Sequence, residues 1–422
     1  MPSRNPSSAN ELSTTAGTDR RSPWPGIAVL ILIGIVIAFV LTSCRTTRLT
    51  GPNQQPLDPA LVAQGKTVFR FDTYGDESFW TDSLRLHEVI RSGVSPKTAL
   101  SVGLKVDLDT LPAAVQSALQ AGQVNLDDPA TTVTLLKLGA VVGVVGKVDA
   151  SNNLTSVGIT CAFCHSTVDN SFAPGIGHRL DGWPNRDLNV GAIVALSPVL
   201  PASAKSVYNS WGPGKYDPRF NFDGQNMPVL IPAAFGLRNV AKEIYTGDDT
   251  ISYWNKYVAV TQMHGHGSFV DPRIAVNVQN PPELVTTAKL AALRAYQFSL
   301  ATPTAPTGLD AAAIARGRAV FTGDGQCATC HVGNTFTDVN DGKLHTAAEV
   351  GQSAAYAARS ATKLYRTTPL RALYHPPQLQ GPYFHDGSAK TLDDVVNHYV
   401  TVRHLNLTAQ QKADLVQYLK SL

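Results

Sequence analysis

Two copies of one short motif constrain this chain more than any other feature of its sequence. CAFCH occupies residues 161–165 and CATCH occupies residues 327–331. C-x-x-C-H is the pattern of covalent haem attachment, in which both thiols form thioethers with the haem and the adjacent histidine binds the iron. We therefore expect two c-type haems. Their attachment and proximal-ligand residues are Cys161, Cys164 and His165 in the first site, and Cys327, Cys330 and His331 in the second.

Two other chemistries also use paired cysteines. A structural zinc site needs four ligands, which two CxxC pairs can supply. A thioredoxin-like redox site places CxxC at the start of a helix that follows a strand. The histidine directly after each pair, His165 or His331, argues against both alternatives. Only Cys44 lies outside the motifs, so we expect no structural disulfide.

The N-terminal region predicts export from the cytoplasm. Residues 26–41 (GIAVLILIGIVIAFVL) are uncharged and apolar, with only glycines interrupting the run. As a helix of about 24 Å, the run is short for a bilayer core of about 30 Å but suits a signal sequence. LTSC at residues 41–44 resembles a lipobox, in which Cys44 becomes lipidated; the alternative is an uncleaved anchor helix. Both place residues 45–422 outside the cytoplasmic membrane, in a bacterial periplasm, and tethered to that membrane.

Composition and low-complexity breaks predict the domain organisation. With 43% hydrophobic residues the chain is neither mostly disordered nor a polytopic transporter, and a net charge of +3 gives no reason to expect a nucleic-acid partner. In chain order, we expect a signal or anchor at 1–44, a polar tether at 45–57, a first haem domain with a large insertion at 58–300, a linker (ATPTAPT) at 301–307 and a second haem domain at 308–422.

Helical patterns flank the second motif. Residues 309–321 combine strong helix formers with apolar residues at helical spacing, and Gly317 falls where close packing against another helix needs a glycine. Residues 408–422 begin with a capping box, Thr408 with Gln411, and have one apolar face. Two crossing terminal helices, with CxxCH just after the first, resemble the class I cytochrome c fold.

A weak internal repeat extends this expectation to the first half. ALVAQGKTVF at residues 60–69 is similar to AIARGRAVF at residues 313–321 through G-[KR]-x-V-F, but a long stretch separates Gly65 from Cys161. We expect a mainly α protein of two class I cytochrome c-like domains, the first with an insertion. The apolar run 133–145 in that insertion either roofs the first haem or is plain core.

A longer stretch resembles a known family. Residues 365–399 (YRTTPLRALYHPPQLQGPYFHDGSAKTLDDVVNHY) are similar to the C-terminal signature of the bacterial di-haem cytochrome c peroxidase superfamily. That superfamily includes the methylamine-utilisation di-haem enzyme and, more distantly, the rubber oxygenases. Its T-P-x-L-R element reads T-T-P-L-R here. In the first half, PGIGHRLDGW at residues 174–183 resembles the family's S-I-G-H-G-W turn.

The resemblance implies a gating ligand on the first haem. His178 matches the removable sixth ligand of the family's peroxidatic haem, and His264 and His266 are alternatives. The family's acid–base Glu has no recognisable counterpart in this chain. Trp211, Trp254 and Tyr257 are candidates for electron conduits between the haems, or for plain core packing.

The second haem needs a different sixth ligand from the methionine that is common in the family. The three methionines, Met1, Met227 and Met263, all lie outside the segment where the family places it. Tyr399 stands near that position, as in the methylamine-utilisation enzyme. Three histidines compete with it: His385, His398 and His404. Oxygen or imidazole ligation in place of thioether lowers a haem potential.

The resemblance also implies a calcium ion between the haem domains. Asn185, Thr367 and Pro369 stand where the family supplies its ligands, and oxygen donors at a loop junction suit calcium. For function, we expect electrons to pass from a small cytochrome or cupredoxin, soluble or membrane-bound, through the two haems to hydrogen peroxide at the first. The alternatives are a pure electron carrier with both irons six-coordinate, and a di-haem oxidase or oxygenase of an organic substrate.

Overall fold

The computed structural model describes residues 56–374 and 381–422. The predicted signal or anchor, Cys44 and almost all of the tether lie outside these residues. Among the described residues, no helix is both long enough and apolar enough to cross a membrane.

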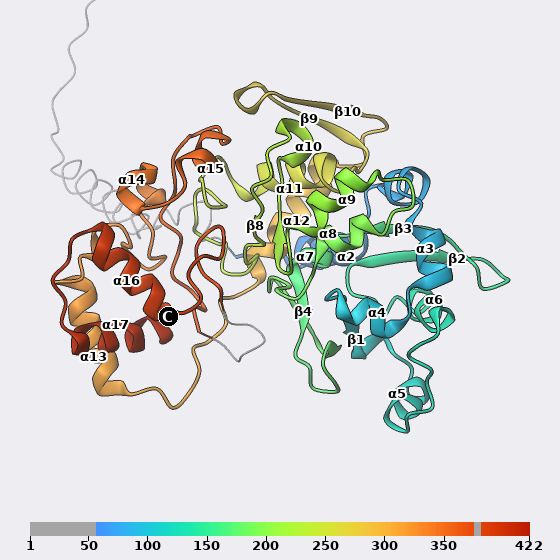
Figure 1. Cartoon of the computed structure of the whole chain (residues 1–422), viewed down its shortest axis with the longest axis horizontal. Coiled ribbons are helices and arrows are strands. Elements are labelled where there is room, and N and C mark those ends of the chain that lie inside the picture. The colour runs from blue at the N-terminus through green and yellow to red at the C-terminus, as the bar shows by residue number, and fades with distance from the viewer. Residues whose placement is uncertain (1–55, 375–380) are drawn as a thin grey trace, which may run out of the picture. The chain divides into compact units, whose positions relative to one another are not determined.

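Helices dominate the chain, as expected for a mainly α protein (Figure 1). The helices of the first half are α2 (Pro59–Phe71), α3 (Leu86–Gly93), α4 (Pro96–Ser101), α5 (Ala113–Gln120), α6 (Pro129–Lys137), α7 (Ala162–His165), α8 (Val190–Ala195), α9 (Ala202–Asn209), α10 (Phe220–Asp223), α11 (Ile251–Thr261) and α12 (Thr287–Ser299), with a π-helix η1 (Ser78–Ser83). Those of the second half are α13 (Ala311–Thr322), α14 (Ala347–Val350), α15 (Ala354–Ala358), α16 (Leu392–Val402) and α17 (Ala409–Lys420).

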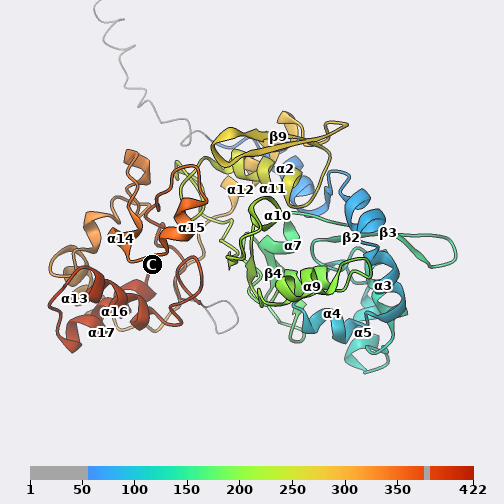
Figure 2. The same cartoon turned by 45° about the horizontal axis from the view of Figure 1, so that its top comes forward.

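The second half is built on the crossing of α13 and α17, which both views show beside α16 (Figure 2). A Cβ placed on Gly317 would lie 2.0 Å from the backbone oxygen of Asp414, so only glycine allows this approach. Thr408 and Gln411 form the predicted capping box at the start of α17. The sequence-based predictions of both helices and of the close approach at Gly317 are confirmed.

The first half contains a second crossing of the same kind. Helices α2 and α12 pack together, and a Cβ on Gly65 would lie 1.9 Å from the backbone oxygen of Ala292. The two glycines of the G-[KR]-x-V-F repeat therefore occupy matching places in two helix pairs. This half also carries strands that the sequence patterns did not predict.

Within the described residues the strands form two-stranded pairs. The pairs are β1 (Val106–Asp107) with β5 (Ile176–Gly177), β2 (Val144–Val148) with β3 (Leu154–Ile159), β4 (Ser166–Val168) with β6 (Arg179–Asp181), β7 (Lys215–Tyr216) with β8 (Val229–Leu230), and β9 (Gly267–Asp271) with β10 (Val276–Asn280). Strands β3 and β4 flank the first CxxCH motif on either side, so that sheet pairing holds both of its ends.

The insertion has an apolar core of its own. Val133, Leu136 and Leu154 are buried together with neighbouring apolar residues. Cys161 and Cys164 pack instead against the larger core that includes α2, α11 and α12. The run that begins at Val133 therefore serves as core in this part of the fold.

Candidate functional site

The second CxxCH motif leaves α13 through a tight turn. Gln326, in the left-handed region at φ 53°, leads into the 3₁₀ turn η4 (Cys327–Thr329). The backbone N–H of His331 donates to the carbonyl of Cys327 (3.0 Å), which brings both thiols and the imidazole onto one short segment. Both cysteines are free thiols, as haem attachment requires.

The imidazole of His331 is oriented for metal binding. Its Nδ1 lies 2.9 Å from the carbonyl oxygen of Phe336, an acceptor, so Nδ1 carries the proton and Nε2 keeps its lone pair. Burial lowers the pKa of His331, which keeps the ring neutral. The neutral tautomer with a free Nε2 is the form that binds iron.

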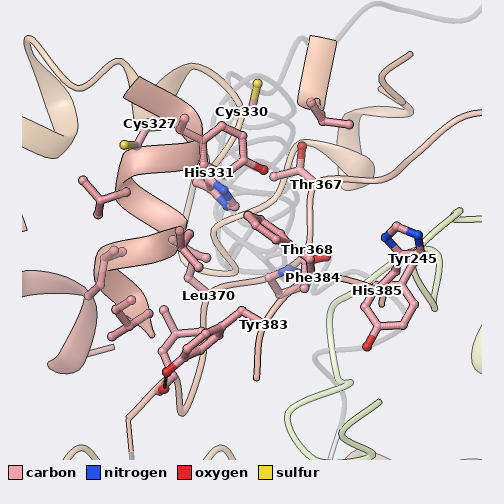
Figure 3. Close-up of a pocket in the computed structure, with 18 of the residues that line it drawn as sticks. Tyr245, Cys327, Cys330, His331, Thr367, Thr368, Leu370, Tyr383, Phe384 and His385 are labelled. Carbon is pink, nitrogen blue, oxygen red and sulfur yellow. Dashed lines mark hydrogen bonds between the residues drawn. The ribbon is translucent and has the colours of Figure 1, made fainter. Parts of the chain in front are cut away.

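A cavity of about 330 Å³ opens beside this imidazole. Both thiols, His331 and apolar residues of α13, α16 and α17 line it, together with the 367–373 segment, and Figure 3 shows His331 and Phe384 directed into it. Its volume lies within the range of ligand pockets, about 300–1,000 Å³. The wall is completed from the first half by Trp183, Pro232 and Phe235 among others. The lining suits a large apolar ring.

The candidates for a sixth ligand of the second haem differ in position. Tyr399 of α16 lines the cavity, and burial, with the nearby cysteines, raises the pKa of its phenol to about 12. His385 also lines the cavity, with Nδ1 2.9 Å from Oε1 of Gln352. His398 donates Nε2 to the carbonyl of Val350. His404 is exposed in the turn after α16.

The first CxxCH motif forms the single turn α7 between β3 and β4. Nδ1 of His165 lies 3.0 Å from the carbonyl oxygen of Pro232, so this ring is fixed as His331 is, with Nε2 left to bind iron. Burial lowers its pKa to about 4. Burial also raises the thiol pKa of Cys161 and Cys164 to about 12, so they are not the activated thiolates of a redox pair.

One loop contacts both sites. The backbone N–H of Gly182 donates to the carbonyl of His165 (2.8 Å), and that of Asn185 donates to the carbonyl of Cys164 (2.9 Å). Trp183, between them, lines the cavity of the second site. Sequence reasoning quoted this tryptophan as part of a motif but gave it no role. The Gly-Trp dipeptide after a His-containing turn was the available signal.

His178 lies on the surface. Its side chain is 55% exposed, and Nδ1 lies 2.8 Å from Oδ1 of Asp109, whose carboxylate raises the pKa of the imidazole. Iron ligation by His178 stays a prediction; the contact with Asp109 occupies Nδ1, so Nε2 is the nitrogen that would bind iron. Of the two histidines that are alternatives to His178, His264 is largely buried. Its ring stacks on that of Phe79, with 3.6 Å between the ring centroids.

His266 has a different environment from His264. Its Nδ1 lies 2.8 Å from the carbonyl oxygen of Pro281, and its Nε2 lies 3.3 Å from the hydroxyl of Ser78. Both ring nitrogens therefore have partners, one at the start of η1 and one directly after β10.

The calcium ligands and the aromatic electron conduits expected from the sequence stay predictions. Asn185 is 2% exposed, its Nδ2 donates to the carbonyl of Gly103, and its buried Oδ1 has no partner within residues 56–374 and 381–422, as a cation ligand would need. Thr367 and Pro369 line the cavity. Trp254 and Tyr257 are buried in the core on α11, and Trp211 packs in an aromatic cluster with Tyr208 and others.

A further set of metal-binding side chains lies beside the second motif. Donor atoms of Cys330, Asp338 and His345 lie within 4.8 Å of one another, and His345 Nε2 lies 3.0 Å from Oδ2 of Asp338. Thioether formation removes the thiolate of Cys330 and leaves a neutral, weakly binding sulfur that is bonded to the haem. The cluster is therefore compatible with haem attachment only as an Asp–His pair next to the haem.

Comparisons with known proteins agree with this geometry. Residues 314–422 match the cytochrome c family. The methylamine utilization protein MauG of Methylorubrum extorquens is 31% identical over 156 residues, covering 31% of this chain and 43% of that protein. The chain thus matches less than half the length of this curated relative.

Two solved structures are also matched, each at 20% identity. They are the Kuenenia stuttgartiensis hydrazine synthase (TM-score 0.34; 46% of this chain and 72% of that chain) and a MauG-like protein associated with microbial copper homeostasis (TM-score 0.33; 47% and 74%). The resemblance predicted from sequence is confirmed by the family and sequence matches: residues 314–422 match the cytochrome c family, and part of the chain is similar to the methylamine utilization protein MauG.

Proposed function

We propose that this protein is a di-haem c-type cytochrome that transfers electrons between two covalently bound haems and reduces hydrogen peroxide at the first. The observation that carries the proposal is the shared geometry of its two CxxCH motifs. In each, a backbone carbonyl fixes Nδ1 of the histidine and leaves Nε2 for iron, next to two free thiols. When bound, haem supplies one-electron chemistry and a site for an oxidant.

The loop around Trp183 supports electron transfer between the sites. It is hydrogen-bonded to the backbone of Cys164 and His165, and its indole lines the cavity of the second site. A covalent and hydrogen-bonded route therefore leads from the first motif to the wall of the cavity beside the second motif. We propose this loop, rather than Trp211, Trp254 or Tyr257, as the conduit.

His178 is the proposed gate at the first haem. His178 lies between β5 and β6, and the glycines on either side of these strands, Gly175 (φ 80°) and Gly182 (φ 84°), adopt left-handed conformations. The gate requires this segment to rearrange. Because Asp109 holds Nδ1 of the exposed ring, Nε2 is the nitrogen that would bind iron, and ligation requires the His178 segment to bring that ring to the first haem. The acid–base group of the reaction is not assigned to any residue.

Haem content is the first test. Denatured protein should retain two haems per chain and give the pyridine haemochrome of haem with two thioether bonds. Cys330→Ala should leave one site intact. Haem that extracts into acidified organic solvent, or stoichiometric zinc in its place, would contradict the proposal.

Spin state is the second test. If His178 is a sixth ligand, the fully ferric first haem is low-spin and inert to peroxide, and reduction of the second haem yields a five-coordinate first haem that reacts. His178→Gly should then give a high-spin ferric haem without prior reduction. An electron carrier predicts instead that the half-reduced protein stays low-spin, with peroxide turnover at the level of free haem. An EPR spectrum unchanged by His178→Gly removes His178 as a ligand.

Location and further components complete the proposal. Covalent haem attachment takes place outside the cytoplasm, so we place the protein in a periplasm, tethered through Cys44 or an N-terminal helix. A small cytochrome or cupredoxin would be the donor, and calcium would bind near Asn185, Thr367 and Pro369. Cys44→Ser should abolish lipid labelling; a mature N-terminus at Met1 without an acyl group would indicate a permanent anchor.

A further inference from the structure

Two largely buried arginines line the cavity of the second site, and neither is paired with a carboxylate of residues 56–374 and 381–422. Arg186 follows the Trp183 loop in the first half, and its Nη1 donates to the carbonyl of Ile231 (2.7 Å). Arg371 belongs to the TTPLR element, and its Nη1 donates to the carbonyl of Gly236. Burial lowers the pKa of both guanidinium groups, that of Arg371 to about 10.

Nearby acids are engaged elsewhere. Glu243, whose charge partly offsets the effect of burial on the pKa of Arg371, pairs through Oε2 with Arg366 at 2.9 Å, and its Oε1 has no hydrogen-bond partner among the described residues. Glu349, a carboxylate on the cavity wall, accepts from the backbone N–H and hydroxyl of Thr346. The segment 375–380 (HPPQLQ) contains no acidic residue.

Other arginines of this chain show the usual arrangement. Arg219 pairs with Asp248 at 2.9 Å, and Arg359 pairs with Asp217 at 2.9 Å. A desolvated charge is costly unless it is paired. Two such charges in the lining of one cavity, whose apolar residues suit a large apolar ring, therefore indicate a ligand that itself carries two negative groups.

We propose that Arg186 and Arg371 bind the two propionate carboxylates of the second haem, so that an arginine of the first half of the chain anchors the haem of the second half. This rests on the proposed function. Guanidinium groups bind carboxylates through paired hydrogen bonds. Since the neighbouring Asn185 is hydrogen-bonded to Cys164, this anchor joins the second haem to the backbone of the first motif.

The anchor has a measurable electrostatic consequence. A positive charge beside a haem favours its reduced, more negative state, so neutralising Arg186 should lower the midpoint potential of the second haem. At a fixed applied potential, the ratio of oxidised to reduced second haem in Arg186→Gln should rise about tenfold, which corresponds to about 59 mV for a one-electron couple. The first haem should shift much less.

The experiment is spectroelectrochemical titration of the full-length holoprotein. Haem content is measured first by pyridine haemochrome, so that absence of haem, which would contradict the proposed function, is separated from failure of this inference. Arg294→Gln removes an exposed arginine of the same half and is the matched control. It should leave both potentials unchanged.

Two more variants keep the test decisive if Arg186→Gln fails to fold. Arg186→Lys retains the charge and should leave the midpoint potential of the second haem close to the wild-type value. Arg371→Gln should lower that potential as Arg186→Gln does. An unchanged second potential in Arg371→Gln and Arg186→Gln with both haems present, or a shift confined to the first haem, would overturn the assignment.

Discussion

The carboxyl group of Asp76 lies in the protein interior, where an acidic side chain is unusual. It is fully buried beside the segment that leads into the first CxxCH motif, and its two oxygens accept from the backbone N–H of Ile159 at 3.2 and 3.3 Å. Burial, opposed by this hydrogen bond, raises its pKa to about 9. Asp76 is therefore protonated and neutral near pH 7.

This shift predicts how stability depends on pH. Because the folded pKa lies above the unfolded value, the folded state holds a proton that the unfolded state releases, and stability falls as pH rises from about 4 to about 9. This one group contributes at most about 1.4 kcal/mol per pH unit. Asp76→Asn keeps an acceptor for Ile159 without ionising, so its unfolding free energy should fall less between pH 5 and pH 8.

Urea unfolding at several pH values measures this difference. The unfolding free energies of the wild-type protein and of Asp76→Asn should differ most at pH 8. There the variant should be the more stable, by about 2 kcal/mol or more. If the unfolding free energies of the two proteins changed with pH in parallel, Asp76 would titrate near its usual pKa. Asp149, whose exposed carboxyl has a lowered pKa, provides a control in Asp149→Asn, which should not flatten the curve.

At the scale of elements, the two helix crossings depend on single glycines. Gly65→Ala and Gly317→Ala each place a methyl group about 2 Å from a backbone carbonyl oxygen of the partner helix. A rigid backbone cannot yield as a side chain does, so each variant should lose about 3 kcal/mol of stability or more. Gly93→Ala is the matched control, because its Cβ meets no heavy atom within 4 Å.

Thermal unfolding measured by circular dichroism checks this prediction. Gly65→Ala and Gly317→Ala should both melt well below the wild type, and Gly93→Ala should melt with it or slightly above. If Gly65→Ala alone were tolerated, the α2–α12 crossing would not be the counterpart of the α13–α17 crossing.

The elements that sequence predicted best are those specified by local patterns. The helix formers around Gly317 and the cap at Thr408 lie within their own elements, and the structure confirms both. The strand pairs could not be predicted in this way. β1 and β5 join residues 70 positions apart in the sequence, Val106 with Ile176, through a pairing too short to leave an alternating pattern.

The candidate sites show the same division. Both CxxCH motifs could be read directly, because their chemistry requires adjacent residues. The walls of the second cavity could not, because Trp183 and Arg186 reach it from the first half of the chain. His178 matched a family turn, but its partner Asp109 comes from a distant turn and is visible only in the fold.

At the scale of the whole molecule, arginines of the second half pair with carboxylates of the first half, and one of these pairs is Arg366 with Glu243 at 2.9 Å. Arg359, at the end of α15, pairs with Asp217 at 2.9 Å and with Asp223 at 2.6 Å, both in the first half. Asp217 also accepts from the backbone N–H groups of Phe220 and Met227. The cluster thus fixes the segment around α10 against the second half, which also walls the haem cavity.

Removing Arg359 should loosen the two halves without disturbing either motif. Arg359→Met leaves the buried Asp217 without its cation, which costs about 3–5 kcal/mol. Cleavage within the 301–307 linker by a non-specific protease should accelerate, while haem content stays at two per chain. Arg316→Met breaks a pair with Asp414 inside the second half, whose arginine is 53% exposed, and should change cleavage little. Equal cleavage in both variants would mean that other contacts hold the halves together.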